Sequence, residues 1–198
     1  MTVLEDRIDM AEIADRQALD AMFEALEHEP FLEGYKIEIV EGAVHMTPQR
    51  DVHWEITRKL IHSLEDRFGR DVKVKSDVRI DFPGYRNGLC PDVAKLRDHA
   101  EQDAEGRWRY QDIDFIGEVI SRGTAANDYG PKLAAYATAG VPVYLIADPY
   151  EGLVHVYTRP DDTEYHVETK VVFGQKVDLT HTPLDLVIDT DKFPRDRK

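Results

Sequence analysis

The sequence is short of cysteine and contains no long run of apolar residues. Cys90 is its single cysteine, so an intrachain disulfide is excluded. No stretch of about 18 apolar residues occurs, which predicts that no helix spans a membrane. The first ten residues, MTVLEDRIDM, lack the basic and apolar regions of a secretory signal. These features together predict a cytoplasmic protein, in which Cys90 is a small buried residue.

Positive charge is also scarce, with 25 Lys and Arg residues against 39 Asp and Glu residues and a formal net charge of −14. Because phosphate contacts dominate affinity for nucleic acid, this balance argues against nonspecific binding to duplex DNA. A locally basic face remains compatible with it. The alternating stretch 72–82 predicts one long strand that carries Lys73, Lys75 and Arg79 on one face. This face is the candidate DNA contact, and a plain solvent-facing strand is the alternative.

Length and composition predict a single domain over residues 1–198, since 42% of the residues are hydrophobic. An N-terminal helix is expected within 1–30, followed by a core over 35–190. A charged stretch at 97–112 is expected to leave this core as a mobile loop that can cover a site. The last residues, 191–198, form a basic tail that is expected to fray.

Local patterns place the secondary structure within this domain. Apolar residues at helical spacing predict helices over 9–27 and 51–68. Alternation with a central Glu-Gly turn predicts a β-hairpin over 35–46. In the loop at 97–112, Trp108 either anchors the loop to the core or stacks on a base.

The centre of the chain shows the pattern of a strand, a helix and a second strand. The two apolar strands are expected over 115–120 and 143–147, and the helix over 128–139. This unit builds a sheet with a covered face, so it predicts an α/β fold. Lys132 and Tyr136 are four residues apart and therefore share one face of the helix.

Two carboxylates lie in or beside the buried strands of this unit. Glu118 interrupts the apolar run 115–120, and Asp92 stands at the start of a short strand over 93–96. A buried carboxylate is costly unless it is paired, and a metal ion is one possible partner. Hard oxygen ligands suit Mg²⁺. Two carboxylates with a nearby lysine are the groups that metal-assisted hydrolysis of a phosphodiester requires.

The ordered motifs extend well beyond these two residues. They are Pro91-Asp92, Glu118-Val119-Ile120-Ser121, Asp128, Lys132, Tyr136, Ala139-Gly140-Val141, Tyr144 and Asp148-Pro149, preceded by Glu38 to Gly42, Met46-Thr47-Pro48 and His53. This set resembles the Uma-two family of restriction-endonuclease-like proteins, within the PD-(D/E)XK nuclease superfamily. The resemblance covers residues 35–158. It implies a restriction endonuclease-like fold, a mixed β-sheet flanked by α-helices.

The resemblance also implies a function and a set of site residues. It implies a DNA endonuclease that depends on Mg²⁺ or Mn²⁺, with a homodimer as a possible assembly. Asp92, Glu118 and the carbonyl of Val119 would be the metal ligands. Glu38 and His53 would complete the cavity as supporting or general-base groups.

One departure from the superfamily pattern concerns the catalytic lysine. The acidic-X-Lys tripeptide reads Glu118-Val119-Ile120 here, so isoleucine stands in the lysine position. The family resemblance assigns the role to Lys132, which would orient water or stabilise charge. The departure and the negative charge keep two alternatives open. One is a catalytically inactive nuclease fold that binds or scaffolds, and the other is a hydrolase of small phosphoesters.

Overall fold

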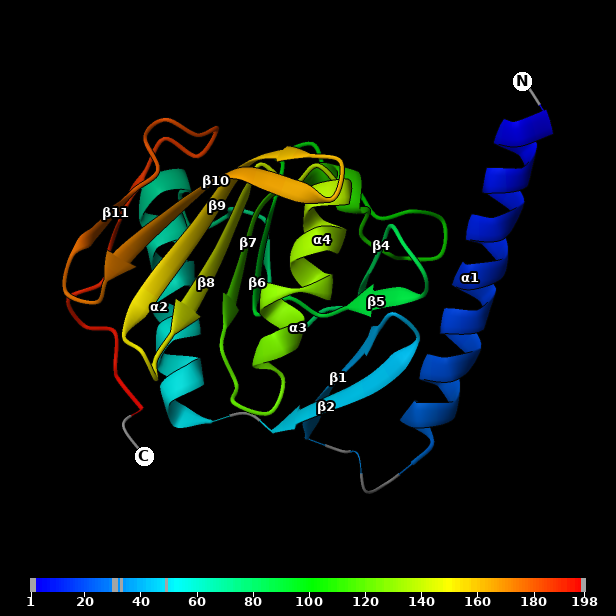
Figure 1. Cartoon of the computed structure of the whole chain (residues 1–198), viewed down its shortest axis with the longest axis horizontal. Coiled ribbons are helices and arrows are strands. Elements are labelled where there is room, and N and C mark those ends of the chain that lie inside the picture. The colour runs from blue at the N-terminus through cyan, green and yellow to red at the C-terminus, as the bar shows by residue number, and fades with distance from the viewer. Residues whose placement is uncertain (1–2, 30–31, 33, 49, 197–198) are drawn as a thin grey trace.

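The computed structural model describes residues 3–29, 32, 34–48 and 50–196. It contains a four-stranded sheet with the order β2 (Ala43–Pro48), β1 (Tyr35–Val40), β5 (Asn87–Leu89) and β4 (Ile80–Phe82). A six-stranded sheet has the order β10 (Glu164–Val172), β9 (Leu153–Asp161), β8 (Val143–Asp148), β7 (Ile113–Val119), β6 (Val93–Leu96) and β3 (Val74–Lys75). The helices are α1 (Val3–Glu27), α2 (Asp51–Phe68), α3 (Ala125–Tyr129) and α4 (Pro131–Thr138). The predicted α/β fold, a mixed sheet flanked by helices, is confirmed (Figure 1).

The six-stranded sheet is mixed because one of its strand pairs is parallel. β7 and β8 run parallel, whereas β6, β9, β10 and β3 join by antiparallel pairing. The predicted strand, helix, strand unit is therefore present, but its helix is divided at Gly130. Proline is favoured in the first turn of a helix, where its missing N–H costs nothing, so Pro131 begins α4 as a new helix. The prediction of a single helix over 128–139 was wrong in this respect.

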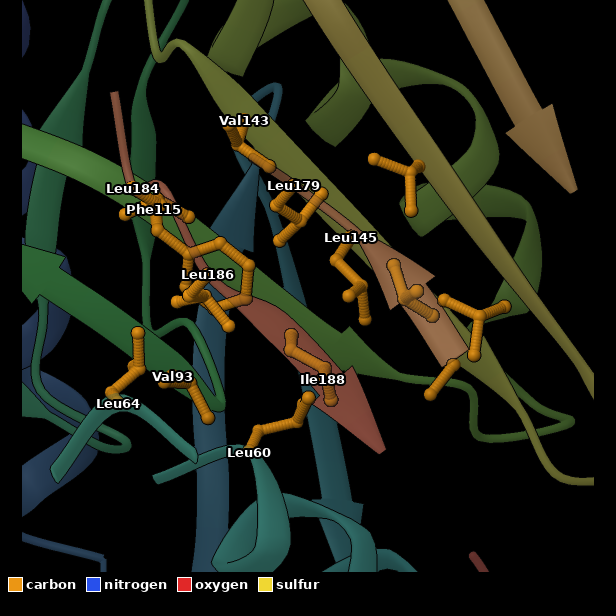
Figure 2. Packing of buried hydrophobic residues seen from close by; sticks show 14 of the residues in the cluster. Leu60, Leu64, Val93, Phe115, Val143, Leu145, Leu179, Leu184, Leu186 and Ile188 are labelled. Carbon is orange, nitrogen blue, oxygen red and sulfur yellow. The ribbon is translucent and has the colours of Figure 1, made fainter. Parts of the chain in front are cut away.

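Alternate residues of β7 build a hydrophobic core on each face of the sheet. On one face, Phe115 packs with Leu60 and Leu64 of α2, a helix whose bounds match the prediction (Figure 2). On the other face, Ile116 packs with Tyr136 of α4. The first core is closed by the strand pair β11 (Lys176–Asp178) and β12 (Val187–Asp189), which the sequence analysis did not predict.

The single strand predicted over 72–82 is not formed. The chain bends at Asp77, whose φ is 56°, so β3 joins the six-stranded sheet and β4 joins the four-stranded sheet. A left-handed residue cannot continue a pleated strand, which is why the alternating pattern misled the prediction. This bend links the two sheets.

The three cations predicted to face DNA are engaged within the protein. Lys73 Nζ donates to the carbonyls of residues 98 and 100, at 2.7 and 2.8 Å. Lys75 Nζ lies 4.7 Å from the centre of the Trp108 ring. Arg79 pairs with carboxylates of α1 and β4, at 2.9 and 2.7 Å. Lys73, Lys75 and Arg79 are each partly exposed, and they do not form one continuous strand face because the chain bends at Asp77.

The loop at 97–112 lies against α1 and does not cover the site. Arg107 pairs with Asp20 of α1 at 3.1 Å. Trp108 packs against the hydrophobic core on the α4 side of the sheet, as an anchoring residue would. The loop ends in a short 3-10 helix, η2 (Tyr110–Asp112). α1 stands beside β4 and β5 in Figure 1.

Both ends of the chain differ from the predictions. α1 begins before the predicted stretch 9–27, and residues 1, 2 and 30 of the predicted N-terminal segment lie outside the described residues. The tail is docked, because Phe193 is buried and the N–H of Asp196 donates to the carbonyl of Pro149 at 3.0 Å. The expectation of a frayed tail was wrong for 191–196, and 197–198 lie outside the described residues.

Two expectations from composition can be compared with the fold. Cys90 is buried, as predicted. Within the described ranges, no helix has the length and apolar character needed to cross a membrane.

Candidate active site

Asp92 and Glu118 meet where the two sheets join. Asp92 precedes β6 and Glu118 lies near the end of β7, and their residues are 1% and 2% exposed. The N–H of Asp92 donates to Glu118 Oε2 at 3.3 Å, and the N–H of Val119 donates to Asp92 Oδ2 at 2.7 Å. These hydrogen bonds from backbone N–H groups to carboxylate oxygens fix the two carboxylates side by side, as the sequence motifs predict.

β1 contributes two further charged side chains from one face of the hairpin. Glu38 Oε1 accepts the N–H of Cys90 at 2.9 Å, so this carboxylate points inward and not to solvent. Lys36, two residues earlier on the same face, places its Nζ 2.6 Å from Asp92 Oδ1 and 3.6 Å from Glu118 Oε2. The sequence analysis missed Lys36. The period of two along a strand is the signal that could have found it, because it puts Lys36 beside Glu38.

α4 contributes Lys132, which reaches the site as predicted. Its Nζ lies 2.7 Å from Glu118 Oε1, 3.0 Å from Asp128 Oδ1 and 3.1 Å from Glu38 Oε1. Three carboxylates thus surround an ammonium that has three N–H donors. Tyr136, one turn later on the same face, donates its hydroxyl to Glu118 Oε1 at 2.8 Å. Asp128 is buried and pairs with Lys132, so it belongs to the same cluster.

α2 contributes His53 from its first turn. The imidazole Nε2 lies 3.0 Å from Asp92 Oδ2, the oxygen that also accepts the N–H of Val119. Burial lowers the pKa of His53, but its hydrogen bond to Asp92 and the charge of that carboxylate outweigh burial and raise the pKa overall. His53 is therefore suited to donate a hydrogen bond to Asp92.

The buried cluster carries more negative than positive charge. Four carboxylates, Glu38, Asp92, Glu118 and Asp128, contact two ammonium groups. With all four carboxylates ionised and His53 neutral, two negative charges would remain uncompensated among these residues. This excess matches the charge of one divalent cation.

The pKa values of the central pair diverge because their neighbours differ. Burial alone raises the pKa of Asp92, but Lys36 and His53 outweigh it and hold that pKa far below its usual range. Burial and the nearby carboxylates raise the pKa of Glu118 to about 8, although both lysines oppose the shift. Without a metal ion, Glu118 therefore takes up a proton far more readily than Asp92 does.

The donor chemistry of the site fits Mg²⁺ or Mn²⁺. No group of three His, Cys, Asp or Glu side chains suited to an ion occurs in the described part of the chain. Mg²⁺ is commonly held by one or two carboxylates, with water and substrate oxygens completing its shell. The carbonyl of Val119 points to the same strand edge as its N–H, which faces Asp92. Asp92 and Glu118 therefore offer carboxylate oxygens of the kind that such an ion prefers, and the carbonyl of Val119 stays the predicted third donor.

Comparisons with known proteins identify the family and the fold of the chain. The model of the Uma2 family, described as "Putative restriction endonuclease", matches residues 20–190. A crystal structure of "a putative nuclease belonging to DUF820" from Anabaena variabilis is similar with a TM-score of 0.62 and 16% sequence identity. The match covers 79% of this chain and 89% of that chain, so it shows a shared fold. A comparison with curated proteins gives no match.

Proposed function

The chain belongs to the Uma2 family of restriction-endonuclease-like proteins, and from that premise we propose that it is a metal-dependent endonuclease that hydrolyses phosphodiester bonds in DNA. The observation that carries the proposal is the placement of Asp92 and Glu118, which lie side by side at the junction of the sheets. A divalent cation would supply Lewis-acid activation of the phosphodiester. The remaining steps depend on the protein's own side chains.

Asp92 and Glu118 would hold the cation, and neighbouring groups already bind one oxygen of each carboxylate. His53 and the N–H of Val119 bind Asp92 Oδ2, which leaves Oδ1 directed into the site. Lys132 and Tyr136 bind Glu118 Oε1, which leaves Oε2 on the side of Asp92. The two ligands are thereby preorganised before a substrate arrives.

Lys132 is proposed to perform the role that a lysine of the tripeptide has in the superfamily. Ile120 stands in that position, and its side chain is buried in the core on the α4 side of the sheet. Lys132 approaches Glu118 from this same side. We propose that its positive charge stabilises negative charge that develops on the phosphate or orients the attacking water. Glu38, held by Lys132 and by the N–H of Cys90, would support this position.

A second candidate is hydrolysis of a small phosphoester by the same site. It is favoured by the net charge of −14 and by the internal pairing of the cations that were expected to contact DNA. An acidic surface repels the phosphate backbone of a polynucleotide much more than it repels one phosphate group. The two candidates differ in substrate and share the site.

Nicking of supercoiled plasmid at low salt with Mn²⁺ or Mg²⁺ tests the proposal. Asp92→Asn and Glu118→Gln should each reduce nicking by at least about 100-fold, the usual effect of removing a preorganised charge-stabilising group. The matched control is Asp112→Asn, since Asp112 is also buried and charged but lies before β7, about 20 Å along the strand from Glu118. Each variant is checked for folding by circular dichroism.

The possible results separate the hypotheses. Equal nicking in all four proteins would show contamination or a different site. Cleavage of bis(4-nitrophenyl) phosphate without plasmid nicking would favour the small-phosphoester hydrolase. Neither activity, together with no Mn²⁺ binding in calorimetry, would favour an inactive nuclease fold.

A further inference from the structure

Lys36 lies between the two carboxylates of the proposed metal site. It contacts both of them, whereas Lys132 contacts Glu118 and does not contact Asp92 among the ion pairs of the described residues. Its side chain is only 7% exposed. A lysine ammonium is a strongly hydrated point charge, so it is buried at this depth only where carboxylates replace its water.

Among the described residues, Lys36 contacts the two carboxylate oxygens that no other side chain of the site holds, and the N–H of Asp92 also donates to Glu118 Oε2 at 3.3 Å. Asp92 Oδ2 is held by His53 and the N–H of Val119, and Lys36 binds Oδ1 at 2.6 Å. Glu118 Oε1 is held by Lys132 and Tyr136, and Lys36 approaches Oε2 at 3.6 Å. A cation held by Asp92 and Glu118 would compete with Lys36 for these oxygens.

From this geometry we infer that Lys36 is a resident counter-ion of the metal site, which a divalent cation must displace from Asp92 Oδ1 and Glu118 Oε2. The inference rests on the proposed function, because it assumes that these carboxylates bind a metal. In the absence of metal, Lys36 compensates the buried negative charge. When the cation binds, it replaces the ammonium of Lys36 as the positive group beside Asp92 and Glu118.

The surroundings provide space and a second partner for the displaced side chain. A cavity of about 310 Å³ lies beside Lys36 and is lined by Asp77, Ile37, Cys90 and the exposed Tyr35. Asp77 Oδ1 lies 3.6 Å from Lys36 Nζ, on the bend that joins β3 to β4. A rotation of the flexible lysine stem therefore moves the ammonium from Asp92 toward Asp77 without a change in the backbone.

Mn²⁺ titration by calorimetry of the whole protein tests the inference. Lys36→Met should bind Mn²⁺ at least about tenfold more tightly than the wild type, which corresponds to about 1.4 kcal/mol. Without metal, Lys36→Met should melt at a lower temperature than the wild type, and saturating Mn²⁺ should narrow this difference. Lys36→Gln serves as a second variant if the methionine variant does not fold.

Two matched variants separate competition from other effects of removing a lysine. Lys95→Met also removes a buried ammonium, one that pairs with Asp114 at 2.8 Å outside the site, and it should leave Mn²⁺ affinity unchanged. Lys132→Met removes a positive charge from the site without freeing an oxygen of Asp92. It should tighten Mn²⁺ binding less than Lys36→Met does, or weaken it.

Three results would overturn the inference. Unchanged or weaker Mn²⁺ binding by Lys36→Met, with metal binding retained by the wild type, would reject competition and leave the proposed function intact. An equal gain in Lys36→Met and Lys132→Met would show a general effect of charge. Absence of Mn²⁺ binding in every protein would reject the metal site itself, and with it the proposed function.

Discussion

Lys132 Nζ lies 2.7 Å from Glu118 Oε1, which brings a lysine of α4 onto the carboxylate of β7. The crossover from β7 to β8 makes this contact possible, because α3 and α4 cover the sheet face to which Glu118 points. Lys132 also pairs with Glu38 and Asp128. The ammonium of Lys132 therefore links α4 to β7 and β1 through ion pairs at the site.

Replacing Lys132 by methionine should destabilise the fold strongly. The change leaves three buried carboxylates without their common partner, and breaking a buried ion pair from one side costs about 3–5 kcal/mol. Urea denaturation at pH 7 without metal measures the loss. A decrease below about 1 kcal/mol would contradict the buried pairing.

Replacing Tyr136 by phenylalanine should weaken metal binding with a moderate loss of stability. The hydroxyl that donates to Glu118 Oε1 would be removed, and one lost buried hydrogen bond costs about 1–3 kcal/mol. The control is Tyr144→Phe, since the Tyr144 hydroxyl is equally buried and donates to the carbonyl of Asp128 at 3.0 Å. The two variants should lose similar stability in urea, while only Tyr136→Phe lowers Mn²⁺ affinity in calorimetry. Equal affinities would show that Tyr136 has a purely structural role.

The elements that the sequence predicted well are those determined by local pattern. α2 has the predicted bounds because its apolar residues recur at the helical period, and β6 because it is a short, mostly apolar run. Asp92 and Glu118 were identifiable because a charge in or beside a buried strand requires a partner. The structure brings Glu38, His53 and Lys132 to the same place, although from sequence only the family resemblance indicated this.

The features that were missed depend on contacts between distant parts of the chain. The pattern of 72–82 is that of a strand, but the left-handed Asp77 sends its two halves into different sheets. Lys36 looks like an ordinary strand cation until the fold places Asp92 against it. β11 and β12 are three-residue strands, too short for periodicity to be visible.

Replacing Gly88 by alanine should disturb the contact between α1 and β5. A Cβ at this position would approach the Phe23 ring to 2.6 Å and Leu19 to 3.4 Å, so the Phe23 ring or α1 itself must shift. Overpacking of this kind costs about 1–3 kcal/mol. Thermal denaturation and limited proteolysis within α1 measure the effect.

The control for this change is Gly123→Ala, because a Cβ at Gly123 meets nothing within 4 Å. Faster cleavage of α1 in Gly88→Ala than in Gly123→Ala is the expected result. Mn²⁺ affinity should be the same in both, since neither glycine touches the site. Identical cleavage would show that α1 is not held by this contact.

The metal-free protein should become less stable as pH rises from about 5 to 8. Burial raises the pKa of Glu118 to about 8 in the folded state, so the native protein binds a proton that the unfolded chain has released above its ordinary pKa near 4.5. For each such proton, the free energy of unfolding falls by up to about 1.4 kcal/mol as the pH rises by one unit. The raised pKa of His53 acts in the same direction, because its stabilising charge is lost as pH rises.

Comparison with Glu118→Gln isolates the carboxylate, because glutamine keeps the shape but cannot titrate. Urea unfolding of both proteins at several pH values should show a steeper fall for the wild type over this range. Asp92 stays ionised in both states there, since its pKa is depressed, and it contributes no slope. Mn²⁺ should bind more tightly as pH rises toward 8, because the cation must displace the proton of Glu118. If the free energy of unfolding changed with pH in the same way in both proteins, Glu118 would be ionised already at neutral pH. Another group would then have to balance the negative charge of the cluster.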